Sequence, residues 1–127
     1  MSEKNWPHFT HAELKCKCGC GENKMDDVFM SKIENLRAAW GKPMKVSSAY
    51  RCQKYNSEVS STGLTGPHTT GKAIDFAIAG DQAFHLVEAA IIHKFTGIGV
   101  SQKGDWDKRF IHIDLIVDTT RPRIWSY

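Results

Sequence analysis

Two segments of the chain alternate between bulky apolar residues and small or polar ones. In residues 71–80 (GKAIDFAIAG) the alternation places Asp75 opposite the bulky apolar side chains, and in residues 110–117 (FIHIDLIV) it does the same for His112. A period of two is typical of a β-strand with one buried face. If the two strands are neighbours in a sheet, Asp75 and His112 project from the same surface of that sheet.

Helical periodicity predicts two longer helices. The first covers residues 25–40, with acidic residues at its start and Gly41 and Pro43 after its end. The second runs from Asp81, a plausible N-cap, to Phe95. Its expected inward stripe consists of Phe84, Val87, Ala90, Ile91 and Phe95.

Shorter elements complete the predicted fold. We expect a strand at residues 44–50, a short helix at 53–59, a loop at 60–66, and a strand at 97–101 that forms a hairpin with 110–117. Mixed helices and hairpin-connected strands favour an α+β fold. Its helices pack on one side of a small, mostly antiparallel sheet.

The chain has the size and composition of one globular domain. Its 127 residues, 41% apolar and 24% charged, predict a single domain over residues 1–127, in which residues 1–21 form a loop-rich, cysteine-containing cap. The net charge of +3 is scattered, which disfavours a nucleic-acid partner. No apolar stretch is long enough to span a membrane. We expect a monomer.

His68, Asp75 and His112 are the candidate metal ligands. A catalytic zinc ion needs about three imidazole or carboxylate ligands and one open coordination position, and two histidines with one aspartate meet that requirement. Glycines around His68 would allow close approach of backbone and metal. The alternative from spacing alone is that each histidine is only a hydrogen-bonded core residue.

A larger set of motifs resembles a known family. The motifs are Ser48-Ala49-Tyr50-Arg51-Cys52, then Asn56, then His68-x-x-Gly71-x-Ala73-x-Asp75, then His112-x-Asp114. In combination they resemble the zinc D-Ala-D-Ala carboxypeptidases of peptidase family M15, whose members include phage endolysins and murein endopeptidases. The opening His8-Phe9-Thr10-x-x-Glu13-Leu14 and the tail Arg121-Pro122-Arg123-Ile124-Trp125 extend the resemblance over most of the chain.

The resemblance implies a fold, a cofactor and a substrate. It implies the fold shared with the hedgehog signalling domain, a Zn²⁺ ion on His68, Asp75 and His112, and Arg51 as the anchor of a substrate carboxylate or carbonyl. Ser48 and Trp106 are further candidate substrate-binding residues, since an aromatic ring near the metal could stack on a peptide or sugar. The predicted activity is hydrolysis of amide bonds in peptidoglycan stem peptides or cross-links.

The proton-transfer group is the point where the sequence departs from the family. Many members carry an acid three residues before the last histidine ligand, where this chain has Arg109. We expect Asp107 to act instead, because a loop side chain could reach over the metal. The alternative for Asp107 is a solvated turn residue. Asp114 could orient His112 or pair with a neighbour.

Four cysteines allow three interpretations. Cys16, Cys18 and Cys20 alternate along the chain, and Cys52 follows Arg51. A structural zinc site is conceivable, although the spacing differs from paired Cys-x-x-Cys knuckles. Disulfides are equally conceivable outside a reducing cytoplasm, and free thiols inside one.

Residues 1–9 lack the apolar run of a secretory signal. We therefore expect synthesis in the cytoplasm, in the setting of a phage-infected bacterium, with action at the cell wall or periplasm after release by a partner. Two other functions compete with the peptidase. One is a non-catalytic, zinc-stabilised binding module of the same fold, which the missing acid at Arg109 favours. The other is a small basic nucleic-acid-binding protein.

Overall fold

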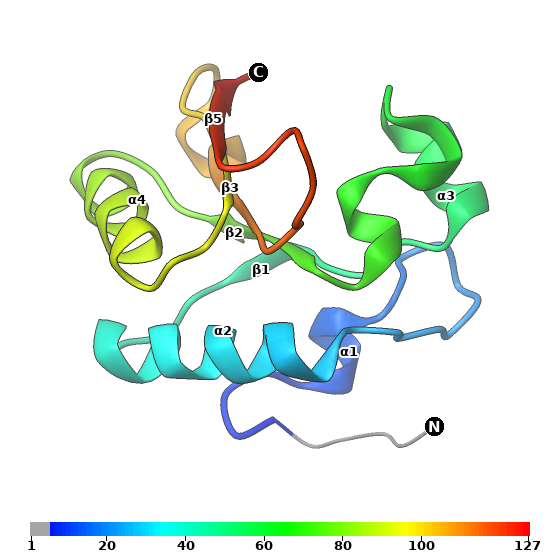
Figure 1. Ribbon diagram of the computed structural model, residues 1–127, viewed down its shortest axis with the longest axis horizontal. Helices are drawn as coiled ribbons and strands as arrows, with labels where there is room; N and C mark the ends of the chain where they lie inside the picture. Colours follow the sequence, from blue (N-terminus) through cyan, green and yellow to red (C-terminus); the bar gives the residue numbers. More distant parts are fainter. Residues whose placement is uncertain (1–5) are drawn as a thin grey trace.

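The computed structural model describes residues 6–127 and has an α+β architecture (Figure 1). A five-stranded sheet lies at its centre, and three short 3₁₀ helices (η) occur in the connections. In chain order the elements are α1 (His11–Leu14), α2 (Asp27–Trp40), β1 (Val46–Ser48), α3 (Gln53–Val59), η1 (Gly63–Thr65), η2 (Pro67–Thr70), β2 (Ala73–Ala77), α4 (Asp81–Ile92), β3 (Gly97–Ser101), η3 (Trp106–Lys108), β4 (Phe110–Asp114) and β5 (Arg123–Ser126).

The strand order in the sheet is β1-β2-β4-β3-β5. The first three pairings in this order are antiparallel, and only β5 runs parallel to its neighbour β3. The predicted hairpin of β3 and β4 and the neighbouring positions of β2 and β4 are confirmed. The sheet is therefore mostly antiparallel, as the sequence predicts.

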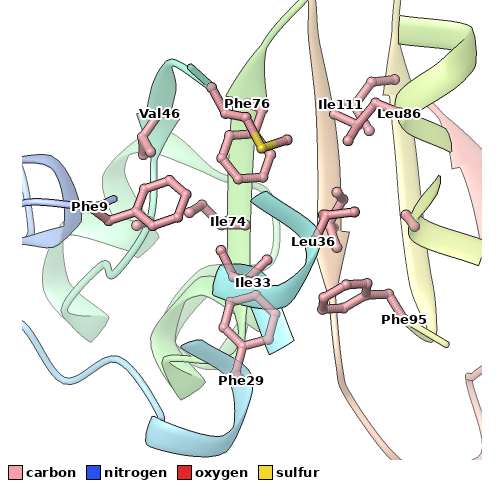
Figure 2. Close-up of a cluster of buried hydrophobic side chains, with 14 of the residues drawn as sticks. Phe9, Phe29, Ile33, Leu36, Val46, Ile74, Phe76, Leu86, Phe95 and Ile111 are labelled. Atoms are coloured by element: carbon pink, nitrogen blue, oxygen red, sulfur yellow. The ribbon is translucent and has the colours of Figure 1, made fainter. Parts of the chain in front are cut away.

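One face of the sheet carries the hydrophobic core. Figure 2 shows side chains of α2, including Phe29 and Ile33, pointing toward Ile74 and Phe76 of β2, with Ile111 of β4 beside them. These side chains are almost completely excluded from solvent. The core forms because every second residue of β2 and β4 is bulky and apolar, so burial of one face is the favourable arrangement. The opposite face is left for polar residues.

The ends of α2 follow from local sequence. The Asp26 side chain accepts a hydrogen bond from the backbone N–H of Phe29, which caps the first turn. Gly41 follows the last turn in the left-handed conformation, with φ of 79°, which glycine adopts at little cost. The predicted helix at residues 25–40 is thus confirmed, with its start two residues later.

The predicted inward stripe of α4 was wrong in part. Phe84 and Ile91 are 70% and 57% exposed. Of the predicted residues, Ala90 is buried and Val87 packs against the core, and the fully inward residues of the helix are Ala83, Leu86 and Ala90. Apolar residues occur around most of this helix, so periodicity alone did not select its inner face; the two alanines allow close approach to the sheet. Phe95 is buried, but it lies beyond the helix end. Gly80, not Asp81, occupies the N-cap position.

Several boundaries also differ from the predictions. β1 is shorter than residues 44–50, β4 ends at Asp114, and β5 was not predicted. The predicted cap at residues 1–21 contains α1 and is otherwise irregular from Trp6 onward, while its first five residues lie outside the described part of the chain. Among residues 6–127, no helix has the length and apolar character required to cross a bilayer.

Candidate metal site and substrate cleft

The three predicted ligands meet on the polar face of the sheet. His68 Nε2 lies 3.2 Å from Asp75 Oδ1, and His112 Nδ1 lies 2.9 Å from the same oxygen. One donor atom from each residue lies within 4.8 Å of the other two. Four-coordinate zinc with bonds of about 2.0–2.1 Å to nitrogen and oxygen separates its ligand atoms by about 3.4 Å. The His–Asp–His site (His68, Asp75 and His112) could therefore hold one metal ion.

Strand register places two of these ligands. Asp75 of β2 and His112 of β4 are directly opposite each other in an antiparallel pair. Side chains of opposed residues project to the same face at close range, so the pair is fixed by the backbone. The core residues on either side of each ligand anchor the strands, because Ile74, Phe76 and Ile111 are fully buried.

The third ligand comes from the turn before β2. His68 lies in η2, which begins at Pro67 and ends at Gly71 in the left-handed conformation, with φ of 75°. A Cβ atom at position 71 would collide with the backbone carbonyl of Lys24. Gly71 is therefore required both for the turn and for close packing, and the turn brings His68 over Asp75.

Hydrogen bonds orient both imidazoles. His68 Nδ1 donates to the backbone carbonyl of Ala49 at 2.6 Å, which leaves Nε2 directed at Asp75. His112 Nε2 is 2.8 Å from Asp114 Oδ2, which leaves Nδ1 directed at Asp75. In metal-binding histidines, the ring nitrogen that does not bind the metal usually donates a hydrogen bond to a carboxylate or a backbone carbonyl. The expectation that Asp114 orients His112 agrees with these distances.

The carboxylates and imidazoles of the site shift one another's pKa. Burial by itself raises the pKa of Asp75, but the charge of His68 and the hydrogen bond from His112 outweigh it and hold the pKa well below its usual range. Burial lowers the pKa of His112, yet its hydrogen bonds to Asp114 and Asp75 raise it overall. The carboxylate of Asp75 is thus ionised at neutral pH, as a metal ligand must be.

Arg121 completes the outer layer of the site. Its guanidinium binds Asp114 with two hydrogen bonds, Nε to Oδ1 at 3.0 Å and NH2 to Oδ2 at 2.8 Å. Burial opposes ionisation of Asp114, but hydrogen bonds from His112 and Arg121 lower its pKa to about 2. The guanidinium also stacks over Trp125, whose ring centroid lies 5.1 Å from that of His112. A chain Arg121–Asp114–His112 therefore supports the site.

A cleft of about 930 Å³ opens above the His–Asp–His site. One wall is formed by the segment from the end of α3 through η2, and the other by the β4–β5 connection and β5. In Figure 1 the green segment that follows α3 lies to the right of the orange-red connection between β4 and β5. The lining residues used below are Arg51, His68, Asp75, Phe110, His112, Asp118, Arg121, Arg123, Trp125 and Tyr127.

Arg51 lies at the metal side of this cleft. Its NH2 is 3.8 Å from Asp75 Oδ2, its Nε donates to Ser48 Oγ at 3.1 Å, and its NH1 donates to Asn56 Oδ1 at 3.1 Å. Asn56 is itself almost completely buried and bonded to the backbone of Gly63. The structure thus brings Arg51 to the cleft with a fixed guanidinium, while Ser48 contacts Arg51 and is not among the residues that line the cleft.

Trp106 and Asp107 are not part of the cleft. Both belong to η3, on the connection between β3 and β4, and neither lines the cleft. The Trp106 ring covers Gly80, where a Cβ atom would lie 2.7 Å from it, and the guanidinium of Arg109 stacks on the ring at 5.2 Å. Arg109 also donates to the carbonyl of Gly104. The structure does not bring these residues to the His–Asp–His site.

Sequence reasoning missed six of these cleft residues as parts of the site, namely Phe110, Asp118, Arg121, Arg123, Trp125 and Tyr127. All except Phe110 follow β4, in a segment that carries no alternating pattern. The only signal was that the tail from Arg121 to Trp125 resembles family members. Within residues 6–127, Asp75 and Asp118 are the carboxylates that line the cleft.

The comparison with protein families agrees with this geometry. The family model described as Peptidase M15 matches residues 7–114, which is most of the chain. The protein belongs to the M15 peptidase family. The matched region includes all three residues of the His–Asp–His site, and membership supports a metallopeptidase. A search of the curated proteins found no match.

Proposed function

We propose that the protein is a zinc-dependent peptidase that hydrolyses amide bonds in peptidoglycan stem peptides or cross-links. The observation that carries the proposal is the convergence of His68, Asp75 and His112 below an open cleft, with Arg51 held beside Asp75. Two imidazole nitrogens and one carboxylate oxygen suit Zn²⁺ and leave a coordination position free. When bound there, zinc would polarise the scissile carbonyl and lower the pKa of water to about 7.

Two arginines of the cleft could bind an acidic peptide. Arg51 and Arg123 line the cleft, beside the carboxylates Asp75 and Asp118, and Arg51 is pre-oriented by its bonds to Ser48 and Asn56. A planar guanidinium suits recognition of a carboxylate, and a fixed one loses little entropy on binding. Stem peptides carry free carboxylates. We assign Arg51 to a substrate carboxylate or carbonyl close to the metal.

Aromatic residues form the rest of the binding surface. Trp125 and Tyr127 of the C-terminal segment and Phe110 of β4 all line the cleft, and the rings of Phe110 and Tyr127 lie 5.1 Å apart. Burial raises the pKa of Tyr127. The phenol therefore stays protonated at neutral pH and is available to donate a hydrogen bond to a substrate carbonyl.

A proton must still pass from water to the leaving amine. Asp107 stays the sequence-based prediction for this role, and Asp118 is the alternative that the cleft adds. Asp118 lies in the β4–β5 connection and lines the cleft. Hydrogen bonds from the Thr120 side chain and backbone lower its pKa, so it is a carboxylate at neutral pH. Its position in the cleft favours Asp118 over Asp107.

The proposed setting is a lysis enzyme of a phage-infected bacterium, which is made in the cytoplasm and reaches the wall after release by a partner. The support for this setting is the family resemblance of the motifs. The protein would act as a monomer on a polymeric substrate.

Digestion of bacterial wall sacculi tests the activity. Purified protein is incubated with sacculi in buffer, with a chelator, and with chelator followed by added Zn²⁺. The expected result is release of peptides with new amine termini, identified by mass, that the chelator abolishes and zinc restores. Asp75→Ala serves as the inactive comparison. Absence of release from sacculi of any stem-peptide type would overturn the proposal.

A second candidate is a non-catalytic, zinc-stabilised binding module. The observation that favours it is Arg109 at the position of the family acid, where its guanidinium binds the carbonyl of Gly104 and is not part of the cleft lining. Retention on sacculi with zinc bound and no released peptide would support this candidate over the peptidase.

A further inference from the structure

The four cysteines gather at one point, and one of them, Cys52, directly follows Arg51 in the chain. Cys16 Sγ lies 3.5 Å from Cys18 Sγ and 3.7 Å from Cys52 Sγ, and Cys18 Sγ lies 3.7 Å from Cys52 Sγ. One sulfur from each of the four residues lies within 4.8 Å of the others. Cys52 is 32 or more residues away from the other three in sequence, so the fold has brought it there.

These spacings match the ligand shell of one tetrahedral ion. Zinc–thiolate bonds of about 2.3 Å separate neighbouring sulfurs by about 3.8 Å. A disulfide would need about 2.05 Å between two sulfurs, and all four cysteines are free. An iron–sulfur cluster holds its thiolates on different iron atoms, and so farther apart than four sulfurs around one ion. The sulfur–sulfur distances thus fit a single metal ion better than a disulfide bond or an iron–sulfur cluster.

The loop that carries three of these sulfurs has little else to order it. Residues 17–24 are exposed except for the half-buried Asn23, and no apolar side chain of this stretch enters the core. Gly19 and Gly21 adopt left-handed conformations, with φ of 94° and 77°, in open space. They serve to turn the chain, and the turn aims successive sulfurs at one centre.

Two backbone contacts resemble those expected of a closed metal loop. The N–H of Cys16 donates to the carbonyl of Glu22 at 2.8 Å, which closes the base of the loop. The N–H of Cys52 donates to Cys16 Sγ at 3.3 Å. The second contact fixes the backbone of Cys52 against the sulfur of Cys16.

We propose that Cys16, Cys18, Cys20 and Cys52 form a second, structural metal site that holds one tetrahedral Zn²⁺ ion. Four thiolates and no open position distinguish it from the His–Asp–His site. The ion ties the loop after α1 to the start of α3. Cys52 directly follows Arg51, so the ion also fixes the backbone from which Arg51 reaches the cleft.

Metal counting on the full-length protein tests this site independently of activity. The protein is produced with zinc in the medium and purified with a reductant, and bound metal is measured by elemental mass spectrometry. We expect two zinc ions per chain in the wild type. The double variant His68→Ala/His112→Ala is expected to keep one ion, and Cys18→Ser or Cys20→Ser, both exposed positions, is also expected to keep one. Lys17→Ser, between two ligands, is the matched control and should keep two.

Cobalt substitution provides a second, spectroscopic readout. Co²⁺ bound by four thiolates absorbs strongly in the near ultraviolet through sulfur-to-metal charge transfer, and histidine–carboxylate sites lack this band. We expect the band in the wild type and in His68→Ala/His112→Ala, and its loss in Cys20→Ser. Circular dichroism verifies that each variant is folded.

Three results would overturn the proposal. They are a single zinc ion that disappears in His68→Ala/His112→Ala, absence of the thiolate charge-transfer band in folded wild-type protein, and detection of disulfides among these cysteines by mass after alkylation without reduction. The first of these would leave the proposed peptidase intact. Conversely, loss of peptidase activity in every assay would leave the metal count of the cysteine cluster unchanged.

Discussion

Asp75 and His112 face each other across the β2–β4 pair, with Asp75 Oδ1 2.9 Å from His112 Nδ1. The same register continues across the sheet, because His112 is also opposite Gly99 of β3 and Gly99 is paired with Trp125 of β5. A single row of residues thus joins the metal ligands to the aromatic wall of the cleft. Substitutions along this row should have separable effects on metal binding, on support of the ligands and on substrate binding.

Replacement of the central ligand should abolish both metal binding and activity. In Asp75→Ala the two histidines lose the carboxylate that lies between them, and the metal-capable group of the described residues contains no other acid. We expect the zinc affinity of the site to fall by more than the roughly 10- to 100-fold loss typical of an outer-layer substitution. Titration with a zinc indicator and the sacculus assay measure the two effects. Retained peptidase activity in this variant would contradict the assignment of Asp75.

The alternation of β2 and β4 was sufficient to predict that Asp75 and His112 share a face, because each is flanked by buried residues that fix the register. The same reasoning placed Asp114 behind His112. It could not predict the parallel pairing of β5, which is a long-range contact of a mostly exposed segment. Arg121, Trp125 and Tyr127 reach the cleft only through that pairing.

The prediction for Trp106 and Asp107 rested on their nearness in sequence to His112. In the structure the connection folds toward Gly80, where the Trp106 ring covers a position without a side chain. Sequence distance says little about which way an irregular loop turns, since the turn depends on packing against a remote residue. Phe84 and Ile91 of α4 were wrongly predicted to face inward because the apolar residues of this helix occur on more than one side.

Asp114→Asn should weaken metal binding without removing a ligand. The amide cannot supply the negative charge that now pairs with Arg121 and supports the imidazole of His112. We expect a roughly 10- to 100-fold loss of zinc affinity. Asp118→Asn changes an exposed carboxylate in the β4–β5 connection and should leave zinc affinity unchanged. Equal affinities in wild type and Asp114→Asn would show that Asp114 does not act through His112.

Asp114 should also make the stability of the protein depend on pH in the acid range. The pKa of Asp114 is about 2 in the folded protein and near 3.8 in the unfolded chain, so its contribution is present above pH 4 and is lost as pH falls toward 2. The shift corresponds to about 2 kcal/mol of unfolding free energy. The free energy of unfolding of the two proteins, with metal removed by a chelator, can be measured by urea denaturation at a series of pH values. The difference in this free energy between wild type and Asp114→Asn should shrink as the pH falls from 4 to 2. A difference that stays constant down to pH 2 would contradict the assigned pKa.

Gly99→Ala should disturb the aromatic wall and spare the metal. A Cβ atom at position 99 would lie 2.8 Å from Trp125 Nε1 and 2.9 Å from the Tyr127 hydroxyl, so both rings must move. Overpacking of this kind costs about 1–3 kcal/mol of stability. We expect a higher KM for wall peptides with one zinc ion still at the His–Asp–His site. Ser101→Ala, in the same strand and outside the cleft, is the control and should behave as wild type.

Asp118→Asn and Asp107→Asn together decide which carboxylate transfers the proton. Asp118 lines the cleft and is ionised at neutral pH through its hydrogen bonds to Thr120, whereas Asp107 is exposed in η3 on a surface that the cleft does not reach. Loss of a general base typically lowers kcat by about 10²- to 10⁴-fold, and we expect this loss in Asp118→Asn with zinc content unchanged. Asp107→Asn is expected to retain kcat within about threefold, a change of less than 1 kcal/mol in the barrier. Steady-state kinetics on a released stem peptide across pH measures both variants. If Asp107→Asn carried the loss and Asp118→Asn did not, the loop of η3 would have to close over the metal during turnover, and the role predicted from the sequence would stand.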